Sequence, residues 1–175
     1  TSIFSLYIVD DVGDHLFVGT SGGLFETMDG AETWVPVTAT NAWGGIGSIR
    51  NGTINGKPYL LLGASGGLGT VPINKDGSML NSTWNLIRSP PGSAAWRTNA
   101  VSLAEFDGNG KPLHNSKLVG CLWIGGRGVL HLLTMINETA AEWDVRPNEP
   151  CQAAAIDPNN ADHILVNNAS NGAHV

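Results

Sequence analysis

The chain has 175 residues, of which 42% are hydrophobic and 14% charged, and its 9 basic and 15 acidic residues give a net charge of −6. No basic cluster occurs, which argues against a nucleic-acid partner, because such binding needs Lys and Arg to neutralise phosphates. The apolar runs fall short of the roughly 20 residues that span a membrane, while 23 glycines and short β-branched runs favour an all-β protein with many turns.

One phrase of strand, glycine turn and strand recurs along the chain. Its first copy covers residues 16–24 and its second covers residues 60–68, with the same glycines and serine at an offset of 44 residues. The third copy, residues 121–129, is looser. The fourth, residues 164–172, has asparagine in place of glycine, and asparagine also tolerates left-handed backbone. The chain is therefore expected to be a repeat protein.

A tryptophan follows a polar turn near the end of the first three units, at Trp34, Trp84 and Trp143. A period of about 40 to 60 residues with four strands per unit is typical of β-propeller blades. We therefore expect an all-β propeller of four-stranded antiparallel blades, of which about three and a half are present. The expected blades are residues 1–39, residues 45–89, residues 97–147 and, for the start of a fourth, residues 152–175.

Propellers close into rings of roughly four to eight blades, and three and a half blades do not complete a ring. We therefore expect the remainder of a longer chain to close the propeller, with assembly from several copies as the alternative. The chain lacks an initiator methionine and a signal-peptide pattern, which is typical of a mature or truncated start.

The turn after the first repeated phrase follows the pattern Ser/Thr-x-Asp-x-Gly-x-Thr-Trp, except that Ala31 stands where the pattern has glycine. Its residues are Thr27, Asp29, Gly30, Thr33 and Trp34. This segment resembles the Asp-box, or BNR, repeat of sialidase-like and xyloglucanase-like β-propellers. A carboxylate at such a corner accepts backbone N–H bonds, and the tryptophan can insert between neighbouring sheets, so we expect a structural role. The second and third copies of the box are degenerate.

The resemblance implies that a ligand binds on the face away from the Asp boxes. Two long connections assigned to that face contain matching tryptophans, and sugar rings stack well on indole. The candidate carbohydrate-binding residues are therefore Trp43, Trp96, Arg97 and Arg127. The alternative is that both tryptophan rings fill gaps between adjacent blades.

Catalytic signals are weak. The Phe/Tyr-Arg-Ile-Pro motif of sialidases is absent, although glycosidases of other propeller families use a pair of carboxylates. Candidates for one partner lie at the ends of predicted first strands: Asp10, Asp11, Glu105 and Asp107. A solvated turn residue is the alternative for each of them. The five histidines lack ligand spacing, so we expect no metal and no cofactor.

Two features of the sequence, its cysteines and its glycosylation sequons, concern the cellular compartment of the protein. Cys121 and Cys151 either form a disulfide or remain buried as small apolar groups. Four glycosylation sequons favour a secreted chain that carries glycans. Their asparagines are Asn51, Asn81, Asn137 and Asn168.

The sequence favours a secreted or surface-exposed recognition and scaffold module that binds a glycan or a protein. The alternative is a sialidase-like or xyloglucanase-like glycoside hydrolase whose catalytic residues lie partly outside this chain. An enzyme requires carboxylates that converge on the propeller axis, whereas a binding module requires only aromatic and polar loops there.

Overall fold

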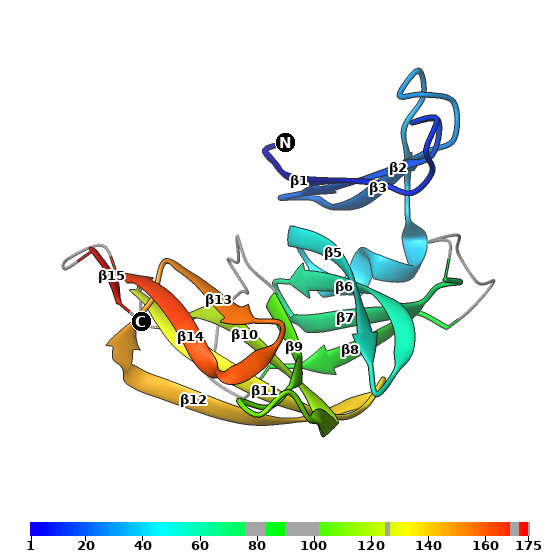
Figure 1. Cartoon of the computed structure of the whole chain (residues 1–175). Coiled ribbons are helices and arrows are strands. Elements are labelled where there is room, and N and C mark those ends of the chain that lie inside the picture. The colour runs from blue at the N-terminus through cyan, green and yellow to red at the C-terminus, as the bar shows by residue number, and fades with distance from the viewer. Residues whose placement is uncertain (76–82, 90–101, 125–126, 169–171, 175) are drawn as a thin grey trace.

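A computed structural model describes residues 1–75, 83–89, 102–124, 127–168 and 172–174 of the chain. Its elements are β-strands except for one short 3-10 helix, η1 (Thr38–Trp43). Consecutive strands pair antiparallel and form separate sheets (Figure 1). Within these residues no helix has the length and apolar character needed to cross a membrane.

The first two sheets are four-stranded meanders in which each strand pairs with the next in the chain. The first sheet contains β1 (Ile3–Ile8), β2 (Leu16–Thr20), β3 (Gly23–Thr27) and β4 (Val35–Pro36). The second sheet contains β5 (Ile46–Ile54), β6 (Lys57–Ala64), β7 (Gly67–Pro72) and β8 (Asn85–Arg88).

The third sheet is a four-stranded meander as well, and the fourth has three strands in its described part. The third contains β9 (Ser102–Phe106), β10 (Pro112–Ile124), β11 (Arg127–Asn137) and β12 (Ala140–Pro150). The fourth contains β13 (Ala153–Asp157), β14 (Asn160–Asn168) and β15 (Gly172–His174). This arrangement confirms the prediction of an all-β propeller fold with about three and a half blades.

Each repeated phrase forms the hairpin between the second and third strands of a sheet. The last pairs before the turns of the first two sheets are Thr20 with Gly23 and Ala64 with Gly67. Gly23 and Gly67 have φ angles of 120° and 144°, a region that side chains disfavour and glycine accepts. The repeated glycine is therefore a backbone requirement of the turn.

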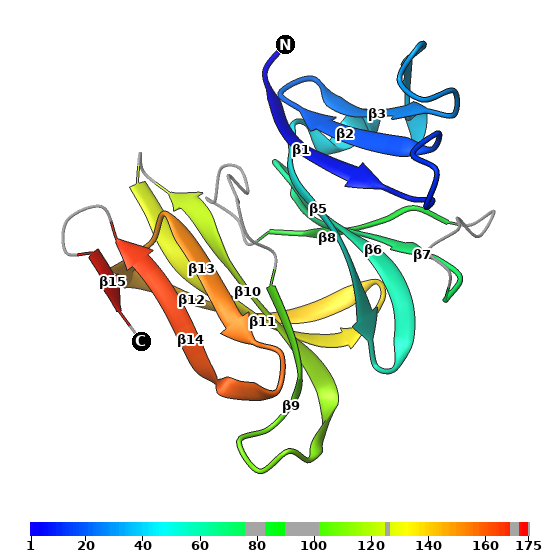
Figure 2. The same ribbon diagram turned by 45° about the horizontal axis from the view of Figure 1, so that its top comes forward.

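Apolar side chains fill the spaces between consecutive sheets. The cluster shared by the first and second sheets includes Phe17, Ile46 and Leu60. The cluster shared by the second and third includes Leu61, Leu118 and Leu133. The cluster shared by the third and fourth includes Val119, Cys121 and Ile156. The sheets follow one another along an arc that is open between β1 and β15 (Figure 2).

A disulfide joins the third sheet to the connection that leads into the fourth. Cys121 in β10 is bonded to Cys151, with the two Cα atoms 5.5 Å apart, and both residues are buried. Of the two alternatives that the sequence left open, the cysteines therefore pair.

Candidate functional site

The hairpin turns and the connections between sheets lie on one face of the molecule. In the second sheet, Ser65 N donates to Gly45 O at 2.8 Å and Gly66 N donates to Trp43 O at 2.9 Å. These hydrogen bonds hold the turn of the second sheet against the chain that arrives from the first. We call this the hairpin-turn face, and its described parts are residues 21–22, 38–45, 65–66 and 151–152.

The opposite face contains the loops at the other ends of the same strands. Residues 28–34 join β3 to β4, and residues 9–15 join β1 to β2. Gly30 N donates to Asp14 O at 3.0 Å, so the two loops lie together. We call this the box face. It is separated from the hairpin-turn face by the length of the strands.

Both carboxylate oxygens of Asp29 accept hydrogen bonds within its own turn. Its Oδ1 accepts hydrogen bonds from Thr27 Oγ1 at 2.6 Å and from Thr33 N at 2.9 Å, and its Oδ2 accepts one from Thr33 Oγ1 at 2.5 Å. These donors stabilise the ionised form and lower the pKa of Asp29 to about 2. Ala31 has a φ of 74°, a left-handed angle, and occupies the position where the Asp-box pattern has glycine.

Trp34 differs from the sequence expectation, because it is 37% exposed and does not lie between two sheets. In the second sheet, the corresponding Trp84 packs on the preceding sheet, with its ring centroid 6.3 Å from that of Phe17. The first sheet has no preceding sheet within the described part of the chain. Among the described residues, the ring of Trp34 therefore has no neighbouring sheet to pack against.

Asp10 and Asp107 act as acceptors for their own turns. Asp10 accepts three backbone N–H bonds from residues 13–15, at 2.7, 3.1 and 3.0 Å. Asp107 accepts bonds from Asn109 N and Lys111 N, both at 2.9 Å, and these bonds lower its pKa. Both carboxylates are thus arranged as turn acceptors, which is the alternative that the sequence offered.

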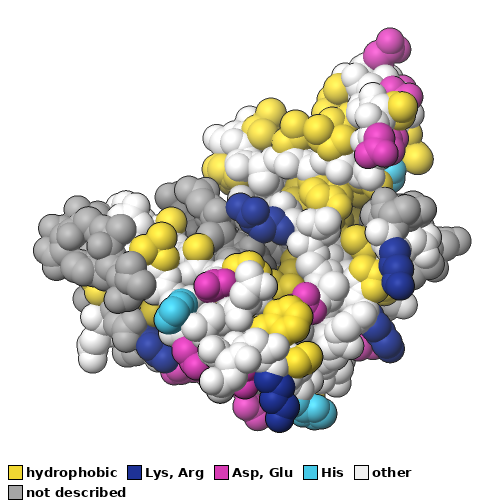
Figure 3. Space-filling view, viewed as in Figure 1, with side chains coloured by type: hydrophobic (Ala, Val, Ile, Leu, Met, Phe, Trp, Pro, Cys, Tyr) yellow, Lys and Arg dark blue, Asp and Glu magenta, His cyan; other side chains and the backbone are white. Residues whose placement is uncertain are grey.

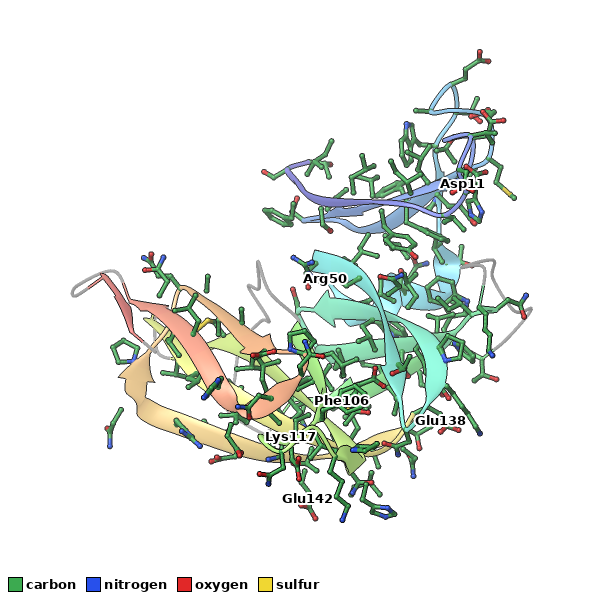
Figure 4. The ribbon with its side chains drawn as sticks, viewed as in Figure 1. Asp11, Arg50, Phe106, Lys117, Glu138 and Glu142 are labelled. Atoms are coloured by element: carbon green, nitrogen blue, oxygen red, sulfur yellow. A yellow bond between two sulfur atoms is a disulfide. The ribbon has the colours of Figure 1, made fainter. Side chains whose placement is uncertain are left out.

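Asp11 and Glu105 belong to different sheets. Asp11 is exposed in the loop between β1 and β2. Glu105 lies in β9, where partial burial raises the pKa of its carboxyl group. Asp11 lies far from Phe106, the neighbour of Glu105 (Figure 4). The structure therefore places these two carboxylates on different sheets.

The structure places the candidate ligand-binding residues in different environments. Trp43 is 6% exposed at the end of η1, where its ring lies over Gly69 of β7. Gly69 has no side chain, which leaves room for the ring between the first and second sheets. Because the ring is buried there, it is not available for stacking on a sugar. Trp96 and Arg97 lie outside the described residues. Arg127 is described by its backbone, at the start of β11.

The sequons occupy different settings. Asn51 is exposed in β5, and Asn137 is exposed where β11 turns into β12. Asn137 Oδ1 accepts bonds from Thr139 N at 2.9 Å and from Thr139 Oγ1 at 2.8 Å. Asn168 ends β14, and Asn81 lies outside the described residues. Two of the four asparagines are thus on the surface in the described part.

Sequence reasoning missed two polar features between sheets. Asn55 donates through Nδ2 to Ile136 O at 3.1 Å and accepts a bond from Ser116 N at 3.2 Å, which joins the second sheet to the third. His131 is fully buried, with its ring centroid 5.7 Å from that of Trp143, and burial lowers its pKa to about 4. The apolar neighbours of His131 on both sides along its strand were a usable signal for burial, whereas Asn55 had none.

The described residues contain no group of three His, Cys, Asp or Glu side chains placed to hold a metal ion.

No protein-family model matches the chain, and no curated protein shows significant similarity to it. Among solved structures, the chain is similar to the crystal structure of an ancestral GH74 enzyme, with 12% sequence identity over 97% of this chain and a TM-score of 0.40. The chain spans 29% of the length of that structure. The architecture described above rests on the sheet topology of this chain alone.

Proposed function

We propose that the chain is part of an Asp-box β-propeller that serves as a secreted or surface-exposed recognition and scaffold module. Its ligand is a glycan or a protein. The observation that supports this function best is that the aspartate carboxylates form hydrogen bonds within turns. Asp10, Asp29 and Asp107 all accept backbone hydrogen bonds within their own turns, so these acidic groups serve the fold.

The hairpin-turn face is the proposed binding surface. It combines the small polar turns of the first two sheets with exposed connections that include Asn41 and Gln152. Trp96, Arg97 and Arg127 remain proposed contributors to this surface, whereas the burial of Trp43 removes that ring from the proposal.

The proposed location is outside the cell or in an equivalent oxidising compartment. A buried disulfide between Cys121 and Cys151 supports this location, because such bonds persist where thiols are not kept reduced. The exposure of Asn51 and Asn137 is compatible with glycosylation of both sequons.

A second candidate function is a glycoside hydrolase whose catalytic residues lie partly outside this chain. It is supported by Glu105, since a carboxyl group with a raised pKa suits the general acid of such an enzyme. Hydrolysis needs a second carboxylate on the other side of the scissile bond. Within the described residues, the candidate partners Asp10 and Asp107 are engaged in their turns.

The proposed function can be tested by affinity electrophoresis in gels that contain xyloglucan or a sialylated glycoprotein. We expect retardation, and we expect Asn41→Ala and Gln152→Ala to weaken it, since both residues are exposed on the hairpin-turn face. Asp11→Ala and Glu32→Ala on the box face are matched controls that leave retardation unchanged. Stronger effects from the box-face variants would contradict the proposed surface, and no retardation in any gel would leave protein recognition as the function.

A further inference from the structure

The two sequons with exposed asparagines differ in the backbone conformation around them. Asn51 and Thr53 both lie in β5, which pairs with β6 along this segment. Asn137 and Thr139 lie where β11 turns into β12, and Asn137 pairs with Ala140 across the turn. Exposure of the asparagine does not separate the two sequons, so the side chains around each amide are compared.

The chemistry of glycan attachment sets the requirements on these side chains. Asparagine Nδ2 forms a bond to C1 of the first sugar, and the lipid pyrophosphate that carried the oligosaccharide leaves. The amide loses one proton to a base of the transferase. The sequon also needs the hydroxyl of the residue two positions later. A sequon is therefore a good acceptor where Nδ2 faces solvent and this hydroxyl lies beside the amide.

Asn137 meets both requirements. Its Oδ1 accepts hydrogen bonds from Thr139 N at 2.9 Å and from Thr139 Oγ1 at 2.8 Å. The two bonds hold the amide plane and place the hydroxyl next to it. Among the described residues, Nδ2 of Asn137 has no hydrogen-bond partner, and both Asn137 and Thr139 are exposed. The amide nitrogen is thus available for the transfer.

The second sheet holds this turn without using the side chain of Asn137. Thr70 Oγ1 donates to Glu138 O at 2.6 Å, and Asn55 Nδ2 donates to Ile136 O at 3.1 Å. Glu138 lies at the end of the β11–β12 hairpin, beside the second sheet (Figure 4). At this end of the second and third sheets, the space-filling view shows mainly charged and other polar side chains (Figure 3). A glycan on Asn137 therefore extends into solvent and displaces no contact of the turn.

The sequon of Asn51 lacks the hydroxyl. Thr53 Oγ1 is buried, and among the described residues it has no hydrogen-bond partner. Asn51 pairs with Leu60, which is 0% exposed, and Thr53 pairs with Pro58. The extended backbone is held by the neighbouring strand, and the buried hydroxyl is not presented beside the amide.

The two conformations also differ in when they form. The hydrogen bonds of Asn137 lie within its own turn, and such local bonds form in a chain that has not yet folded. The conformation of β5 instead depends on pairing with β6. The turn therefore presents its sequon both before and after folding, whereas folding of the sheet withdraws the sequon of Asn51.

We propose that Asn137 is the acceptor of an N-linked oligosaccharide and that Asn51 is not. This inference rests on the extracellular location in the proposed function, because the transfer takes place in the secretory pathway, and it does not depend on the proposed ligand. The β11–β12 turn lies at the opposite end of β11 from the β10–β11 hairpin. A glycan there leaves the hairpin-turn face uncovered.

Secretion of the chain from a eukaryotic cell, behind a cleavable signal sequence, tests the assignment. Peptide:N-glycosidase leaves aspartate in place of each glycosylated asparagine, which mass spectrometry of peptides detects. We expect a glycan at Asn137 on most chains and an unmodified Asn51. Asn137→Gln should lose this glycan, whereas the matched Asn51→Gln should leave the glycan pattern unchanged. Thr139→Ser keeps the hydroxyl and should keep the glycan, and Thr139→Val should lose it.

Alkylation of free thiols in the same secreted sample verifies that Cys121 and Cys151 are paired, as in the folded chain. Paired cysteines together with an unmodified Asn137 would overturn the inference and leave the proposed location and ligand unaffected. Equal occupancy of Asn51 and Asn137 would overturn it as well. A glycan at Asn137 on a chain that shows no retardation in the affinity gels would support this inference and contradict only the proposed glycan ligand.

Discussion

Removal of the disulfide between Cys121 and Cys151 measures how much the tie between the third and fourth sheets stabilises the fold. The crosslinked residues are 30 apart in the sequence. In the chain-entropy model, closing a loop of this length lowers the entropy of the unfolded chain by about 12 cal/mol/K. At 25 °C this corresponds to about 3.6 kcal/mol of stability, within the usual range for native disulfides.

Urea unfolding of a Cys121→Ala and Cys151→Ala double variant, at the same protein concentration as the native chain, checks this value. The free energy of unfolding should fall by about 3 to 4 kcal/mol, and the melting temperature should fall by about 7 to 15 °C for a chain of this size. The m-value should rise, because the unfolded chain without its crosslink exposes more surface.

Reduction of the unmodified chain provides the control. Reduced native protein and the double variant should lose the same stability within about 1 kcal/mol, since both cysteines are small and packed among other apolar groups. A loss below about 1 kcal/mol in both samples would refute the reasoning, because it would mean that the crosslink restrains the unfolded chain very little.

Three further predictions concern packing and the Asp29 turn. Gly69→Ala should destabilise the fold by about 1 to 3 kcal/mol in urea unfolding, because the added Cβ would clash with Trp43 Cζ3 and lie 3.0 Å from Trp43 Cε3 of the buried ring. Leu61→Ala should cost about 2 to 5 kcal/mol because Leu61 is 1% exposed, whereas Leu165→Ala should change the stability by no more than about 0.5 kcal/mol because Leu165 is 45% exposed. The pKa of Asp29 is about 2, below its unfolded value of about 3.9, so its contribution is complete above about pH 4 and is lost as the pH falls through about 2. Asp29→Asn should remove that part of the pH dependence in acid unfolding.

Each of these predictions has an outcome that would contradict it. Gly22→Ala is the control for Gly69→Ala, because its Cβ would meet only ordinary contacts at 3.7 and 3.8 Å, and equal losses would show that sterics are not the cause. Equal losses for the two leucine variants would show that the fourth sheet is covered. An unchanged acid transition in Asp29→Asn would show that the turn does not depend on its carboxylate charge.

Local patterns in the sequence were sufficient to predict the hairpins and the sheets. Turn glycines such as Gly23 and Gly67 are required by the backbone angle at their own position, so the signal and its cause lie in the same few residues. The meander then follows because consecutive strands pair with each other. The roles of Asp10 and Asp107 as hydrogen-bond acceptors in turns also depend on adjacent residues, so the local sequence was sufficient to suggest them.

Contacts between sheets were beyond what the sequence alone could predict. Trp43 is buried because Gly69, which lies in the third strand after η1, leaves room for its ring. Trp34 is exposed because no described sheet packs on that side of the first sheet, although its own local pattern matches that of Trp84. The pairing of Cys121 with Cys151 depends on the approach of two segments, which spacing does not specify.

The most direct test of a binding function without catalysis is the treatment of xyloglucan with the purified chain, followed by measurement of both retention and released reducing ends. We predict retention on the polysaccharide and no release of reducing ends above a sample without protein. Release that is abolished by Glu105→Gln would contradict this function and establish the chain as part of a glycoside hydrolase, since burial raises the pKa of Glu105 and a raised carboxyl pKa favours a general acid.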